Sequence, residues 1–68
     1  MSVVVHKEGL NIGVLERSLF GFKVKFNTVD ENNKSISCTT IPMTEEMILK
    51  DWRYANEEEV YQYNEGRN

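Results

Sequence analysis

The stretch that most constrains the fold runs from residue 20 to residue 41, where apolar and polar residues alternate along two segments. A period of two is typical of a β-strand that buries one face and exposes the other. In the first segment one face carries Phe20, Phe22, Val24, Phe26 and Thr28, and the other carries Gly21, Lys23, Lys25 and Asn27. The pattern therefore predicts a strand whose phenylalanines face the core.

A return strand is expected over residues 35–41, after a turn at residues 30–34 whose Asp and Asn residues tolerate a positive φ. A three-residue loop over residues 31–33 places Phe26 opposite Cys38, which keeps the apolar sides of both strands on one face. A two-residue loop would put them on opposite faces. We therefore predict an antiparallel hairpin with the three-residue loop.

Two further strands are expected before this hairpin. Three consecutive valines within residues 2–6 predict the first, because valine favours extended backbone. Residues 11–17 predict a second, short strand. The four segments together indicate an antiparallel meander of three to four strands over residues 1–41.

The apolar period changes after Pro42, and the new pattern predicts a C-terminal helix over residues 44–65. Thr44 suits the N-cap, because its hydroxyl can accept a hydrogen bond from the first turn. On a continuous helix, with about 100° per residue, one stripe would cover the apolar face of the sheet: Ile48, Leu49, Trp52, Val60 and Tyr63. Asn56 and Glu59 match a capping box, so a kink or a restart near residue 56 is the alternative.

These elements predict one α+β domain over residues 1–68, a small antiparallel sheet with a C-terminal helix packed on one face. A chain this short buries only about 60% of its unfolded surface, so its core is small. Phe22, Phe26 and Trp52 are expected to form that core.

The sequence argues against an enzyme. His6 and Cys38 are its only strong ligands for transition metals, and they share no spacing motif. As a nucleophile and base they would lack an orienting group and an oxyanion hole. The glycines fit no phosphate-binding loop. We therefore expect no catalytic residue, no metal and no cofactor.

A single cysteine fits a reducing compartment, because no disulfide can form within the chain. The sequence shows no secretory signal and no apolar run long enough to span a membrane. We expect an intracellular, cytoplasmic protein that is soluble and does not engage a membrane.

A spacing of seven residues places Met47, Tyr54 and Tyr61 on the back of the expected helix, with Arg53 beside them. These residue types are enriched at protein interfaces. The leading hypothesis is a small, non-enzymatic accessory protein that binds another protein as a regulator or inhibitor, or that associates with itself, for example as a homodimer. The alternative for this surface is a helix break near residue 56 that returns one or both tyrosines to the core.

A second hypothesis is a role connected with nucleic acid. RNA or single-stranded DNA would bind weakly through Arg17, Lys23 and Lys25, although the phenylalanines that could stack on bases point away from the lysines. In the other version, the acidic C-terminal helix imitates nucleic acid, because residues 44–68 carry seven acidic side chains. The acidic C-terminal region argues against nucleic acid as a direct partner.

Overall fold

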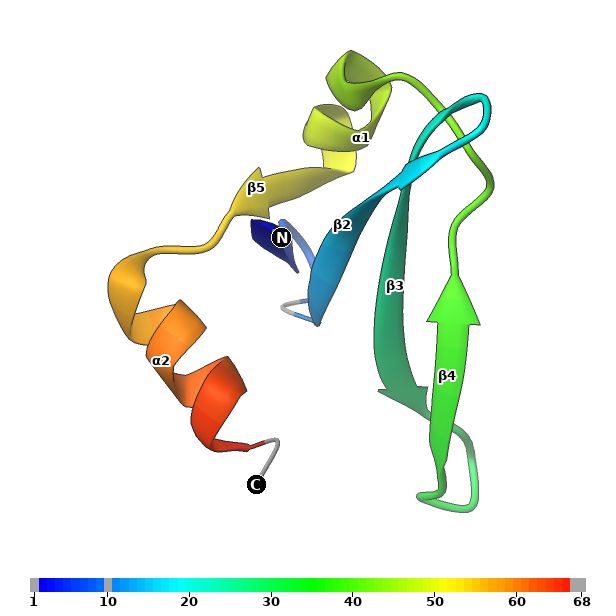
Figure 1. The fold of residues 1–68 in the computed structure, drawn as a ribbon. Helices are drawn as coiled ribbons and strands as arrows, with labels where there is room; N and C mark the ends of the chain where they lie inside the picture. Colours follow the sequence, from blue (N-terminus) through cyan, green and yellow to red (C-terminus); the bar gives the residue numbers. More distant parts are fainter. Residues whose placement is uncertain (1, 10, 67–68) are drawn as a thin grey trace.

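The computed structural model describes residues 2–9 and 11–66, which form an antiparallel sheet and two helices (Figure 1). In chain order the elements are β1 (Ser2–His6), β2 (Ile12–Ser18), β3 (Gly21–Val29), β4 (Ser35–Thr39), α1 (Glu45–Asp51), β5 (Trp52–Tyr54) and α2 (Glu57–Glu65). The sheet has five strands in the order β4-β3-β2-β1-β5. The expected α+β class is confirmed, but the sheet has five strands where the sequence predicted three to four.

The additional strand, β5, interrupts the helix that the sequence predicted over residues 44–65. Trp52 takes up extended backbone (φ −122°, ψ 152°) directly after α1. β5 then pairs antiparallel with β1, with Val5 opposite Arg53. This pairing satisfies backbone groups on the outer edge of β1, which a continuous helix would leave without partners. The continuous helix is therefore wrong, whereas a restart near residue 56 is confirmed by the capping box of Asn56 and Glu59.

The hairpin of β3 and β4 has the register that the sequence predicted, with Phe26 opposite Cys38. The turn depends on Asp30, whose side-chain oxygen accepts hydrogen bonds from the backbone N–H groups of Asn32 (2.8 Å) and Lys34 (2.9 Å). Asn33 has a φ of 62°. The three-residue loop is therefore built by residues that fold the turn locally.

The core lies on the face of the sheet that α1 covers, which we call the α1 face. Its buried side chains are Val4, Leu15, Val24, Ile48 and Trp52, with Phe22, Phe26 and Met43 packed against them. The Phe26 ring lies against Trp52 with the ring centroids 5.3 Å apart. Trp52 is thus in the core as expected, whereas Phe22 and Phe26 are only partly buried against it. Phe20 lies outside the core, because β3 begins at Gly21 and Phe20 belongs to the preceding turn.

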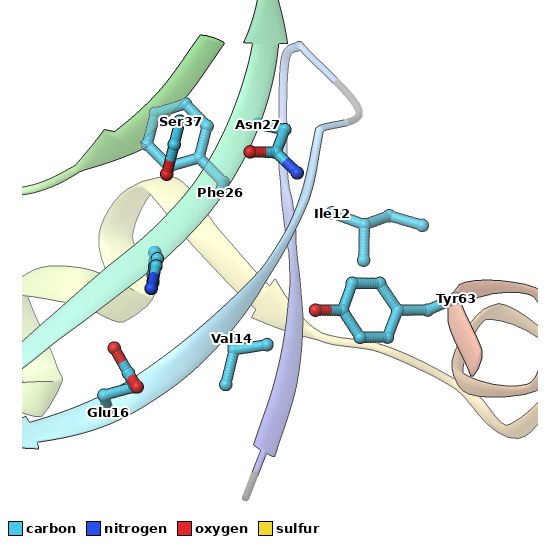
Figure 2. A pocket seen from close by; sticks show the side chains of 8 residues that line it. Ile12, Val14, Glu16, Phe26, Asn27, Ser37 and Tyr63 are labelled. Carbon is cyan, nitrogen blue, oxygen red and sulfur yellow. The ribbon is translucent and has the colours of Figure 1, made fainter. Parts of the chain in front are cut away.

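The opposite face of the sheet is partly covered by α2, and we call it the α2 face. Val5 and Val14 are buried on this face. Tyr63 extends from α2 to lie beside Ile12 and Val14 (Figure 2). The apolar stripe predicted on a single helix is consequently divided: Ile48 and Trp52 pack on the α1 face, and Tyr63 packs on the α2 face.

Candidate protein-binding surfaces

The turn between β2 and β3 carries two large apolar side chains with almost no protein around them. Ser18 pairs with Gly21, so Leu19 and Phe20 alone form the tip of this hairpin. The side chains are exposed to 95% and 83% respectively. We call these two residues the apolar tip. Soluble proteins expose single apolar side chains often, but an adjacent leucine and phenylalanine at the end of a hairpin is a candidate contact point.

The base of the apolar tip is fixed to the segment that connects β4 to α1. The Phe22 N–H donates to the Met43 carbonyl oxygen (2.7 Å), and the Met43 N–H donates to the Phe22 carbonyl oxygen (2.8 Å). Gly21 has a φ of +114°, and a Cβ there would lie 2.5 Å from the Met43 carbonyl oxygen. Figure 1 shows the connecting segment passing beside the hairpin. The backbone at the base of the apolar tip is therefore held in place by its hydrogen bonds with Met43.

Sequence reasoning missed the apolar tip because Phe20 continues the alternation of Phe22, Val24 and Phe26. The signal that identifies it is Gly21, which allows the positive φ that a tight turn needs. A glycine directly after Phe20 indicates that the strand begins at Gly21.

Ile41 is also largely exposed. It lies on the segment between β4 and α1, whose Met43 is hydrogen-bonded to the base of the apolar tip.

A groove of about 200 Å³ lies on the α2 face (Figure 2). Its lining residues come from β2, β3, β4 and α2: Ile12, Val14, Glu16, Lys25, Phe26, Asn27, Ser37 and Tyr63. Tyr63 with Ile12 and Val14 forms an apolar side, and Asn27 of β3 with Ser37 of β4 lies on the opposite, polar side. The groove arises because α2 covers the β2 side of this face and leaves the β4 side open.

The residues predicted as a protein-binding stripe do not share one helix face. Met47 lies on α1, Tyr54 on β5 and Tyr61 on α2, and all are exposed. Arg53 and Tyr54 are consecutive in a strand, so their side chains point to opposite faces of the sheet. Because β5 separates the two helices, a spacing of seven residues does not place these side chains on one helix face.

Two of these residues form side-chain hydrogen bonds with the helices at the protein surface. The Tyr54 hydroxyl donates to Glu45 Oε2 (2.5 Å), and this bond raises the pKa of the Tyr54 phenol. The Arg53 guanidinium donates to both carboxylate oxygens of Glu59, at 2.8 Å each. Arg53 lowers the pKa of Glu59 to about 2, and a hydrogen bond from the Asn56 N–H contributes to the shift. These contacts join β5 to α1 and to α2.

The three cations of the nucleic-acid hypothesis do not converge. Lys23 and Lys25 lie on the α2 face, because Lys25 pairs with Val14 and Lys23 pairs with Glu16. Arg17 pairs with Phe22 and therefore belongs to the α1 face. Glu16, directly opposite Lys23, adds a negative charge to the same face.

His6 and Cys38 are far apart in the sheet, because β2 and β3 lie between β1 and β4. The His6 ring packs edge-on against Trp52, with centroids 4.9 Å apart. Its Nδ1 accepts hydrogen bonds from the N–H groups of Glu8 (3.2 Å) and Gly9 (3.1 Å). His6 thus closes the turn after β1.

Within residues 2–9 and 11–66, no three His, Cys, Asp or Glu side chains are grouped so that they could hold a metal ion. In the same part of the chain, neither helix has the length and apolar character needed to cross a membrane.

Comparison with protein-family models, with curated proteins and with solved structures finds no match to this chain.

Proposed function

We propose that this chain is a small, non-enzymatic protein-binding module that regulates or inhibits a larger partner protein. The apolar tip is its main anchor. The observation that carries this proposal is the exposure of Leu19 and Phe20 on a hairpin whose base is tied to Met43.

The energetics support an anchoring role. Burying one leucine or phenylalanine side chain contributes roughly 1.5–3 kcal/mol. Interfaces draw most of their free energy from a few such side chains seated in pockets of the partner. Because the hydrogen bonds between Phe22 and Met43 already hold the hairpin, less conformational entropy is lost when the apolar tip binds.

The expected partner surface is an apolar pocket in a protein. A single myristoyl chain gives only marginal binding to a membrane, and Leu19 and Phe20 together offer no more apolar carbon than such a chain. A protein pocket adds shape complementarity and excludes water around both side chains, which a bilayer does less specifically.

Photo-crosslinking from the apolar tip tests the proposal. A benzophenone side chain is placed at position 20 and, as the control, at position 29, because Val29 is also exposed but lies at the other end of β3. Both proteins are irradiated in lysate of the source cells, and adducts are identified by mass spectrometry. We expect one specific protein adduct from position 20 and none of that protein from position 29.

Competition then tests whether the apolar tip itself provides the affinity. Excess wild-type protein and the Val29→Ser variant should suppress the adduct, whereas the Leu19→Ser/Phe20→Ser variant should not. The double variant should keep the thermal midpoint of the wild type, because both side chains are exposed. If it competes as well as the wild type, or if both positions give the same adducts, the apolar tip is not the anchor.

A further inference from the structure

The strand β4 forms one edge of the sheet, and its outer side is open. It lies at the end of the strand order and pairs with β3. Natural proteins usually protect such an edge with lysine, proline, a bulge or a very short strand. β4 has the sequence Ser-Ile-Ser-Cys-Thr, with none of these residues, and four of its five residues are exposed. The opposite edge, β5, has only three residues.

Hydrogen bonds at both ends of the hairpin show which backbone groups of β4 point outward. The Asp30 N–H donates to the Lys34 carbonyl oxygen, and the Thr40 N–H donates to the Val24 carbonyl oxygen, each at 3.0 Å. Hydrogen-bonded pairs alternate with non-hydrogen-bonded pairs in an antiparallel ladder, so the even-numbered residues of β4 bond to β3. The outward N–H and C=O groups belong to Ser35, Ser37 and Thr39.

We propose that a second copy of this chain pairs antiparallel with β4, with the two-fold axis passing through Ser37. In this register Ser37 faces Ser37 of the second copy, and Ser35 faces Thr39 of the second copy. The outward groups of each strand then meet, and all five residues of β4 are paired. An axis at residue 36 or 38 pairs fewer residues of the strand.

The side chains agree with this axis. Ile36 faces Cys38 of the second copy on the α1 face, so the apolar row that begins with Phe26 and Cys38 continues into the other sheet. Serine and threonine face each other on the α2 face. At the end of the strand, Lys34 faces the uncharged Thr40 of the second copy. No like charges are opposed, and within β4 each apolar side chain meets an apolar one and each hydroxyl side chain meets a hydroxyl one. This match favours a second copy over an unrelated strand.

This dimer is independent of the proposed function, because neither residue of the apolar tip belongs to β4. The experiments therefore fail separately: loss of the dimer leaves photo-crosslinking at position 20 unaffected, and the Leu19→Ser/Phe20→Ser variant still dimerises.

Engineered disulfides test the register. Residues facing each other in a hydrogen-bonded antiparallel pair have Cα atoms about 5.5 Å apart, within the roughly 4.4–6.8 Å that a disulfide spans. In a Cys38→Ser background, Ser37→Cys should form a disulfide-linked dimer on mild oxidation. Ser35→Cys alone should not, but a mixture of Ser35→Cys and Thr39→Cys should give the mixed dimer.

Proline at the outward N–H tests the pairing without engineered bonds. Ser37→Pro removes a group that bonds only to the second copy, and proline is tolerated at such edge positions. Sedimentation should show a dimer for the wild type and for Ser37→Ala, and a monomer for Ser37→Pro with an unchanged circular dichroism spectrum. If Ser37→Pro unfolds, the disulfide pattern decides.

Three results would overturn the proposal. The first is a wild-type chain that stays monomeric at its highest soluble concentration. The second is a disulfide from Ser35→Cys alone that forms as readily as one from Ser37→Cys. The third is a spontaneous disulfide between Cys38 of two wild-type chains, which would place the axis at residue 38.

Discussion

Arg53 and Glu59 form a bidentate salt bridge between β5 and α2, with Nη1–Oε1 and Nη2–Oε2 distances of 2.8 Å each. The same Oε1 accepts a hydrogen bond from the Asn56 N–H (3.0 Å). Glu59 therefore caps the helix that it belongs to and also ties that helix to the edge of the sheet. This contact positions α2 over the α2 face, where Tyr63 meets Ile12 and Val14.

The ion pair predicts a loss of stability in acid. The pKa of Glu59 is lowered to about 2 from an ordinary value of 4.5, chiefly by the hydrogen bond from Arg53. A carboxyl group whose pKa is lower in the folded state stabilises the fold above its unfolded pKa, and this contribution disappears as the pH falls through the folded pKa. We expect the thermal midpoint of the wild type to fall between pH 4.5 and pH 2. Circular dichroism melts across this range measure it.

Glu59→Gln should flatten this decline, because its side chain does not titrate. Glu58→Gln is the matched control, since Glu58 is a neighbouring, exposed residue of the same helical turn. A decline in Glu59→Gln as steep as in the wild type would show that other carboxyl groups control acid unfolding.

Two phenylalanines in the same hairpin should respond differently to truncation. Phe26 packs against Trp52 in the core, whereas Phe20 lies in the apolar tip. Phe26→Ala should destabilise the protein by about 3 kcal/mol, the lower end for a phenylalanine because Phe26 is only half-buried. Phe20→Ala should change the free energy of unfolding by less than about 0.5 kcal/mol. Urea denaturation of both variants measures the difference, and equal losses would place Phe20 in the core.

Gly21→Ala should be strongly destabilising. Its φ of +114° is unfavourable for any other residue, and the added Cβ would overlap the Met43 carbonyl oxygen. We expect a loss of at least about 2 kcal/mol from backbone strain and steric overlap together. Gly9→Ala is the control, because the nearest atoms to a Cβ there are 3.7 Å away. Similar stabilities for the two variants would mean that the hairpin is not held by the contact of Gly21 with Met43.

The parts of the fold that the sequence predicted are those that local pattern controls. The alternation from Phe22 to Thr28 has one interpretation, and only an odd loop length keeps both apolar faces together. The N-cap of α1 and the capping box of α2 are also local, and Thr44 and Asn56 both accept the expected hydrogen bonds. Each of these elements is determined by residues that are close together in the sequence.

The parts that the sequence missed depend on contacts between distant residues. The sequence around Trp52 is compatible with both a helix stripe and a strand. The strand forms because it pairs with the edge of β1, which lies almost fifty residues earlier. This pairing also separates Met47, Tyr54 and Tyr61 onto three elements. Phe20 was misplaced for a different reason, because one more phenylalanine extends an alternating pattern whether or not the strand continues. The candidate site was consequently less predictable than the fold.

Asn33 provides a local test of the turn that sets the register of β4. Its φ of 62° lies in the left-handed region, where residues other than glycine, asparagine and aspartate are strained by roughly 1–2 kcal/mol. Asn33→Ala should therefore lower the free energy of unfolding by about 1 kcal/mol, whereas Asn33→Gly should leave it nearly unchanged. Asn32→Ala is the control, because Asn32 contributes its backbone N–H to Asp30 and has no positive φ. Chemical denaturation measures all three variants. If Asn33→Gly is as unstable as Asn33→Ala, the asparagine side chain, and not the backbone conformation, is what holds the turn.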